Sequence, residues 1–130
     1  MDGIQAVFTS DLGRAVETAR IAFANGNISI LADWRLRECD YGKMNRHPSA
    51  EVHDNRLLYL DDPYPGGESW RQAVARVGHF LPDLHLRWEN SRVLVIGHLA
   101  TRYAFEHLIN GIPLEDLLQA DFRWQQRCTG

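Results

Sequence analysis

Three titratable side chains in this sequence are of the types that phosphate-ester chemistry requires. Arg14, Glu38 and His98 each follow, within a few residues, an apolar run that is typical of a buried strand. An arginine and a histidine can bind phosphate oxygens, and a carboxyl group can protonate the leaving oxygen. We therefore take Arg14 and His98 as candidate phosphate ligands and Glu38 as the candidate proton donor.

Each of the three residues also has a simpler interpretation. Arg14 could be a surface arginine of a helix, and Glu38 could pair with Arg35 or Arg37. A histidine after a buried strand, such as His98, is often a satisfied core histidine. Residue type and spacing alone leave these alternatives open.

The apolar runs alternate with helical patterns, which predicts an α/β fold: a layered, mostly parallel sheet flanked by helices. In such sheets ligands bind at the carboxyl ends of the strands, where the three side chains would stand. The expected strands cover residues 6–8, 28–31, 92–96 and 122–126. The expected helices cover residues 12–24, 50–60, 101–109 and 114–118, with a loop at 34–48 and a connector at 61–67.

Local signals refine two of the helix boundaries. Ser10 or Asp11 is expected to cap the helix at 12–24, and Ser69 the helix that follows the connector. An apolar stripe then runs from Trp70 to Trp88. Because Pro82 lies inside it, we expect a kink at 78–82.

Composition excludes several classes of function. The net charge of -3 argues against nucleic-acid binding, and the apolar run at 93–96 is far too short to cross a bilayer. Met1 is not followed by a signal-peptide pattern, so we expect a cytoplasmic protein with residues 1–130 in a single domain. Cys39 and Cys128 match no metal or redox spacing. No metal and no cofactor are therefore expected.

Four short motifs together resemble the histidine phosphatase (phosphoglycerate-mutase-like) superfamily. Residues 9–19, T-S-D-L-G-R-A-V-E-T-A, resemble that family's S-D-L-x-R-A-x-x-T-A, and residues 36–42, L-R-E-C-D-Y-G, resemble L-x-E-x-x-x-G. Residues 65–69 match its P-G-G-E-S turn, and residues 93–98, V-L-V-I-G-H, resemble its second histidine motif. The motifs occur in the family's order, so the resemblance spans most of the chain.

The resemblance implies a role for each candidate residue. Arg14 would be the second arginine on the phosphate, Glu38 the acid/base, and His98 the second histidine, which stabilises the transferring phosphoryl group. Ser10 would help to set the helix N-terminus near the phosphate, and Tyr41 would belong to the substrate-side loop. The implied partner is a small phosphorylated molecule or inorganic phosphate, and phosphatase is favoured over mutase.

The family's nucleophilic histidine lies in an R-H-G motif upstream of S-D-L, and this sequence has no such motif. Its one Arg-His pair is Arg46-His47, followed by Pro48, and a surface loop histidine is the favoured interpretation of His47. Both ends of the domain look cut, so we expect an incomplete domain that is inactive as this chain. By resemblance, the absent first strand would lie beside the strand at 92–96. We therefore expect a homo-oligomer in which a second copy covers the gap.

Three interpretations remain. The chain could belong to an enzyme whose missing segment comes from another chain or a longer form. It could be a non-catalytic relative that still binds phosphate. It could also be a module whose remaining role is self-association.

Overall fold

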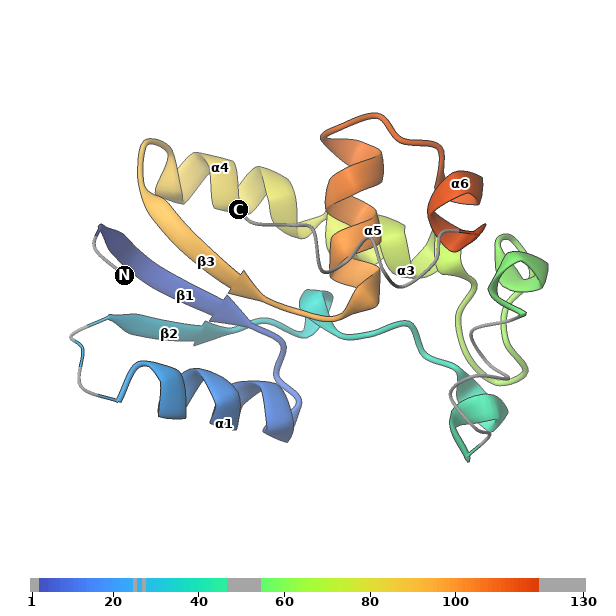
Figure 1. Ribbon diagram of the computed structural model, residues 1–130, viewed down its shortest axis with the longest axis horizontal. Coiled ribbons are helices and arrows are strands. Elements are labelled where there is room, and N and C mark those ends of the chain that lie inside the picture. The colour runs from blue at the N-terminus through green and yellow to red at the C-terminus, as the bar shows by residue number, and fades with distance from the viewer. Residues whose placement is uncertain (1–2, 25, 27, 47–54, 120–130) are drawn as a thin grey trace.

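In the computed structural model, which describes residues 3–24, 26, 28–46 and 55–119, helices lie on both faces of a three-stranded parallel sheet (Figure 1). The strands are β1 (Ile4–Thr9), β2 (Ser29–Ala32) and β3 (Arg92–Ile96). The α-helices are α1 (Gly13–Ala22), α3 (Trp70–Gly78), α4 (Phe80–Trp88), α5 (Leu99–Leu108) and α6 (Leu114–Gln119). Three short 3₁₀ helices connect them: η1 (Trp34–Leu36), η2 (Gly42–Arg46) and η3 (Arg56–Tyr59). The predicted α/β class is confirmed.

β1 is the central strand, and the strand order is β2-β1-β3. Its residues from Ala6 to Thr9 are buried because helices cover both faces of the sheet, which is why this segment reads as an apolar run. The register pairs Thr9 with Ala32 of β2 and with Ile96 of β3. The three strands therefore end at the same edge of the sheet.

Successive residues of β1 point to opposite layers. Val7 packs against Ala19 and Phe23 of the α1 layer. Phe8 lies in the larger core on the other face, with its ring 5.2 Å from that of Phe80 and 5.9 Å from that of Trp88. This larger core also contains α3, α5 and α6, and it supports the segment that carries Glu38.

Several local predictions hold. Ser69 caps α3, accepting a hydrogen bond from the Gln72 N–H, while the Gln72 side chain accepts one from the Ser69 N–H. The kink expected near Pro82 is a break between α3 and α4 at His79. Pro82 itself occupies the first turn of α4, where backbone N–H groups have no intrahelical acceptor, so its missing N–H removes no helical hydrogen bond.

Other local predictions need correction. The N-cap of α1 is Leu12 rather than Ser10 or Asp11, and no side chain caps it. The expected helix at 50–60 is, from Arg56 to Tyr59, only a 3₁₀ turn, and residues 47–54 lie outside the described part. The expected loop at 34–48 contains two 3₁₀ turns. The strand predicted at 122–126 also lies outside the described residues.

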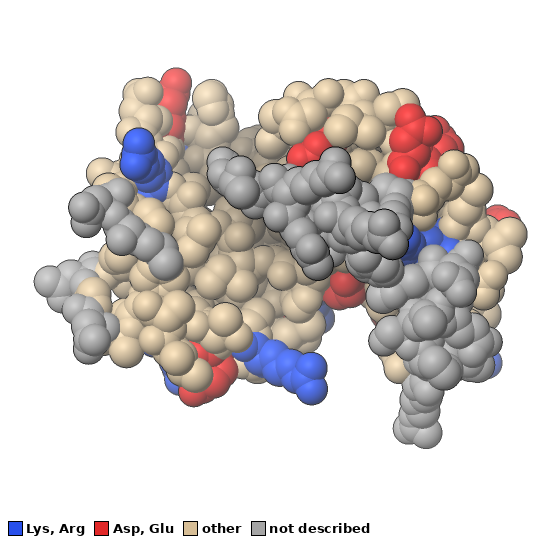
Figure 2. Space-filling model, viewed as in Figure 1, with Lys and Arg blue, Asp and Glu red and all other residues tan. Residues whose placement is uncertain are grey.

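No helix in the described part of the chain is long and apolar enough to cross a membrane. On the face drawn in Figure 2, acidic and basic residues are interspersed among uncharged ones, without a large patch of one sign. This distribution agrees with a net charge of only -3.

Candidate phosphate site

The candidate site begins where β1 and β3 end. Ser10 follows the last residue of β1, and His98 comes two residues after the last residue of β3. Because Thr9 and Ile96 are register partners, these two side chains meet: Ser10 Oγ lies 2.9 Å from His98 Nε2. Ser10 is fully buried, whereas His98 is only half-buried. His98 thus has a buried hydrogen-bond partner but stays partly accessible.

The turn from β3 into α5 fixes the position of His98. The Thr101 hydroxyl oxygen accepts a hydrogen bond of 3.1 Å from the His98 N–H, satisfying one donor at the helix start. The same hydroxyl donates to the Leu36 carbonyl oxygen at 3.4 Å. Gly97 is required at this turn because a Cβ there would overlap the Thr101 side chain.

Glu38 lies against the N-terminus of α5. Its Oε2 accepts a hydrogen bond from the Leu99 N–H at 3.2 Å, and its Oε1 accepts one from the Ala100 N–H at 2.9 Å. Oε1 also accepts the Cys39 N–H at 3.0 Å. Helix N-termini favour negative groups because their first N–H groups lack intrahelical acceptors. The carboxylate thus occupies an anion-binding position next to His98.

The alternative that Glu38 pairs with Arg35 or Arg37 is wrong. Arg35 pairs with Asp33 and Asp83 instead. Arg37 forms a bidentate ion pair with Asp11, with Nε–Oδ1 and Nη2–Oδ2 distances of 2.6 and 2.7 Å. This hydrogen-bonded pair lowers the pKa of Asp11 and joins the segment before α1 to the segment that carries Glu38.

Arg14 and Tyr41 complete the set of predicted residues. Arg14 is exposed in the first turn of α1, and its side chain makes no hydrogen bond or ion pair with any residue that the structure describes. Tyr41 is half-buried, with its ring edge-to-face against Tyr64 and Trp70. Burial raises the pKa of the Tyr41 hydroxyl well above its ordinary value. The structure brings Ser10, Glu38 and His98 together, while Arg14 points to solvent.

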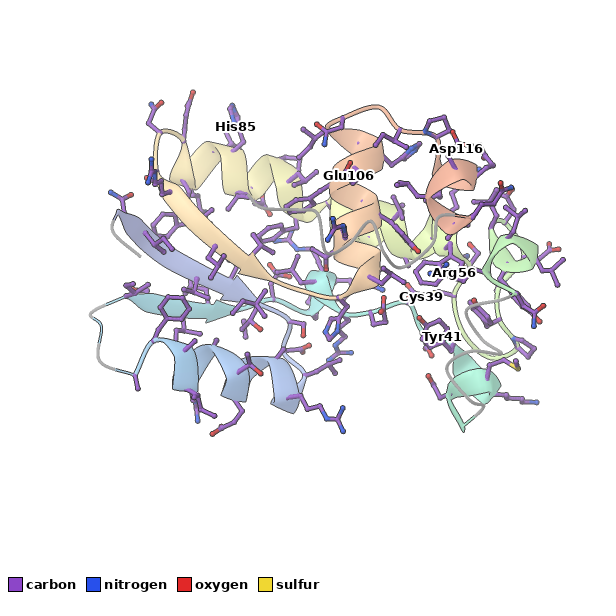
Figure 3. All side chains as sticks on the ribbon, in the orientation of Figure 1. Cys39, Tyr41, Arg56, His85, Glu106 and Asp116 are labelled. Carbon is purple, nitrogen blue, oxygen red and sulfur yellow. The ribbon has the colours of Figure 1, made fainter. Side chains whose placement is uncertain are left out.

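A cavity of about 510 Å³ opens beside Glu38. Figure 3 shows two of its lining residues, Cys39 and Tyr41, on the segment that runs past α3 and α5. Acidic, basic and apolar side chains all contribute to the lining: Leu12, Trp34, Arg37, Glu38, Cys39, Asp40, Tyr41, Asn45, Glu68 and Arg76. Of the predicted site residues, Glu38 and Tyr41 line this cavity, whereas Ser10, Arg14 and His98 do not.

The P-G-G-E-S turn packs against the segment that lines this cavity. The Glu68 N–H donates to the Asp40 carbonyl oxygen at 2.8 Å, and the Lys43 N–H donates to the Pro65 carbonyl oxygen at 2.9 Å. A Cβ at Gly67 would overlap the Asp40 carbonyl oxygen, so the two segments can approach this closely only with glycine there. The turn motif is therefore a packing partner of the segment that follows Glu38.

Some contributors to the site were not identified from the sequence. The N–H groups of Leu99 and Ala100 are backbone donors and leave no residue-type signal. Arg76 and Glu68 form an ion pair of 2.8 Å next to the Glu38 segment. Glu68 was visible as part of a motif, but nothing in the sequence pointed to Arg76 as its partner.

The family model for the histidine phosphatase superfamily (branch 1) matches residues 2–128. The parallel α/β fold of the described residues agrees with this match. The chain belongs to the histidine phosphatase superfamily.

Individual relatives agree with this assignment. The chain is 33% identical over 119 residues to a probable phosphoglycerate mutase of Enterobacter sp. (strain 638), covering 85% of this chain and 55% of that one. It superposes on YhfR of Bacillus stearothermophilus with a TM-score of 0.75 at 26% identity, covering 92% of this chain and 63% of YhfR. A mycobacterial glucosyl-3-phosphoglycerate phosphatase, solved with inorganic phosphate, shares the fold with a TM-score of 0.71 at 21% identity, with coverage of 91% and 64%. The chain spans about half the length of the curated relatives it matches.

Proposed function

We propose that this chain binds inorganic phosphate or a small phosphate monoester at the carboxyl edge of its sheet. The observation that carries the proposal is the contact of 2.9 Å between Ser10 and His98, directly before the N-terminus of α5. A histidine and a hydroxyl group are suitable ligands for phosphate oxygens. Arg14 would complete the set by turning its exposed guanidinium toward the bound anion.

The family relationship supports a phosphate ligand. A related phosphatase of the same fold has been solved with inorganic phosphate. For this chain we propose a phosphate group, free or esterified to a small alcohol, as the ligand.

Binding can be tested by the shift in Tm that inorganic phosphate produces. We expect phosphate to stabilise the native chain and to give little stabilisation to the His98→Ala variant. His85→Ala is the control, because His85 lies on α4 and points away from the site (Figure 3). Equal stabilisation of both variants by phosphate would contradict the proposal.

We propose further that this chain alone does not hydrolyse phosphate monoesters. Of the histidines that the structure describes, only His98 contributes to the site, and phosphoryl transfer in the family requires a second, nucleophilic one. An aryl phosphate assay of the native chain, with His98→Ala and His47→Ala alongside, checks this. Activity that disappears in either variant would contradict the proposed inactivity.

The edge of the sheet favours a second role, which is self-association. Within the described residues β3 pairs only with β1, and its Leu94 and Ile96 are half-buried beside the α1 layer. An apolar strand with one open edge is a template for pairing. We expect a homo-oligomer in which a second copy covers β3. Light scattering at micromolar concentration tests this, and a monomer would count against it.

A further inference from the structure

The segment that carries Glu38 has no helix or strand of its own to fix it. Regular structure ends with η1 at Leu36 and resumes at Gly42. The two carboxylate oxygens of Glu38 nevertheless accept hydrogen bonds from the N–H groups of Leu99 and Ala100. Its backbone must therefore be held by residues from elsewhere in the fold.

Arg76 of α3 contacts this backbone at three carbonyl groups. Its Nη1 donates to the carbonyl oxygens of Arg35 and Arg37 at 3.0 and 2.8 Å. Its Nη2 donates to the carbonyl oxygen of Glu38 at 3.0 Å. One guanidinium thus satisfies three carbonyl groups of the segment, a geometry that only the planar fork of arginine provides.

Glu68 completes the arrangement from the other side. Its carboxylate accepts hydrogen bonds from Arg76 Nε and Nη2 at 3.0 and 2.8 Å, and from the Asp40 N–H at 3.0 Å. The Arg76 side chain is only 11% exposed, so water competes little with these bonds. Burial would raise the pKa of Glu68, but the hydrogen bonds from Arg76 and Asp40 outweigh it and hold the pKa below the ordinary value.

We propose that Glu68 and Arg76 are positioning residues that hold the Glu38 carboxylate at the N-terminus of α5. They act through the backbone on both sides of Glu38, since Arg76 contacts only its carbonyl oxygen. Without the pair, residues 37–40 would regain conformational freedom, and the carboxylate would spend less time on the two N–H groups. The importance of this for a ligand rests on the proposed phosphate binding, but the positioning itself does not.

Amide hydrogen exchange of the unliganded chain tests the proposal directly. The N–H groups of Leu99 and Ala100 have no intrahelical acceptor, so Glu38 should account for their protection. We expect Arg76→Gln to lower protection at these two amides on the order of tenfold, as Glu38→Ala does. Amides of β1 should change only with global stability, which separates a local effect from a general loss of structure.

Two further variants sharpen the test. Arg71→Gln is the matched control, because Arg71 lies on the same helix but pairs with Asp61, and it should leave both amides unchanged. Adding Arg76→Gln to Glu38→Ala should cause no further loss at these amides, because both changes remove the same acceptor. If Arg76→Gln does not fold, Glu68→Gln removes the ion pair at less cost and should give the same local loss.

Unchanged protection in a folded Arg76→Gln or Glu68→Gln variant would overturn the proposal, as would additive losses in the double variant. Because the exchange experiment contains no phosphate, its result is independent of the proposed binding. Loss of protection together with a chain that does not bind phosphate would support the positioning role and reject the proposed function.

Discussion

His98 Nε2 and Ser10 Oγ lie 2.9 Å apart although 88 residues separate them in the sequence. The contact follows from parallel pairing, which brings the ends of β1 and β3 to one edge of the sheet. Since Ser10 is fully buried, its hydroxyl has no solvent to replace the histidine nitrogen.

Ser10→Ala should therefore destabilise the fold by about 1 kcal/mol, because the ring nitrogen loses its partner in a half-buried place. Urea denaturation measures this change. Thr18→Ala is the control, since the exposed Thr18 hydroxyl bonds only to the Arg14 carbonyl oxygen one turn away. It should change the free energy of unfolding by less than about 0.5 kcal/mol. Equal effects of the two substitutions would show that the Ser10–His98 contact is not stabilising.

Glu38→Ala should have opposite effects on stability and on phosphate binding. Losing the carboxylate leaves the Leu99 and Ala100 N–H groups without an acceptor, which should cost about 1 kcal/mol. The same loss frees two donors and removes a negative charge, so inorganic phosphate should bind about fivefold more tightly. Calorimetric titration would measure the affinity. Glu89→Ala is the control, because it changes the net charge equally at an exposed turn before β3, at the opposite end of that strand from His98. Equally tighter binding in this variant would show that the effect comes from overall charge.

The lowered pKa of Glu68 predicts how stability depends on pH. Because the folded-state pKa lies below the ordinary value of 4.5, the ionised form stabilises the fold. This contribution is complete above pH 4.5 and is lost as the pH falls through the lower, folded-state pKa. Glu68→Gln should therefore lower the free energy of unfolding at neutral pH. In this variant the free energy of unfolding should also fall less steeply as the pH decreases. Denaturation between about pH 7 and 3 checks this, and parallel curves for the two proteins would contradict it.

The two glycines of the P-G-G-E-S turn should differ in their tolerance of alanine. Gly66 has a φ of 76°, and a Cβ there would make only an ordinary contact with the Lys43 side chain, so Gly66→Ala should cost about 1 kcal/mol, from backbone strain alone. At Gly67 a Cβ would overlap the Asp40 carbonyl oxygen, so Gly67→Ala should cost about 3 kcal/mol and displace residues 40–42. Thermal unfolding of both variants gives the comparison. A smaller effect at Gly67 would show that this close approach is dispensable.

The sequence was sufficient to predict the α/β class and to place Ser10 and His98 after the ends of strands. Runs such as 6–8 and 93–96 read as strands because burial on both faces requires apolar residues in succession. Once the strands are parallel, Ser10 and His98 must emerge at the same edge. Their meeting could therefore be anticipated from the strand pattern and the family motifs.

The partners of Glu38 could not be anticipated in the same way. A carboxylate that accepts backbone N–H groups 61 and 62 residues away selects no particular residue type at those positions. The same holds for Arg76, whose acceptors are mostly carbonyl oxygens. Helix periodicity also failed at 56–59, where a 3₁₀ turn replaces the expected α-helix.

The central position of β1 has a consequence for how the protein is made. The ribosome synthesises β1 well before its partner β3, because most of the described chain lies between the two strands. Contacts between such distant segments form slowly, and an apolar strand that waits for its partner can pair with a neighbouring nascent chain. The strand that is best protected in the native state is thus the most vulnerable during translation. Substitutions that make residues 6–8 more hydrophobic should lower the yield of soluble protein even where they leave the native fold unchanged.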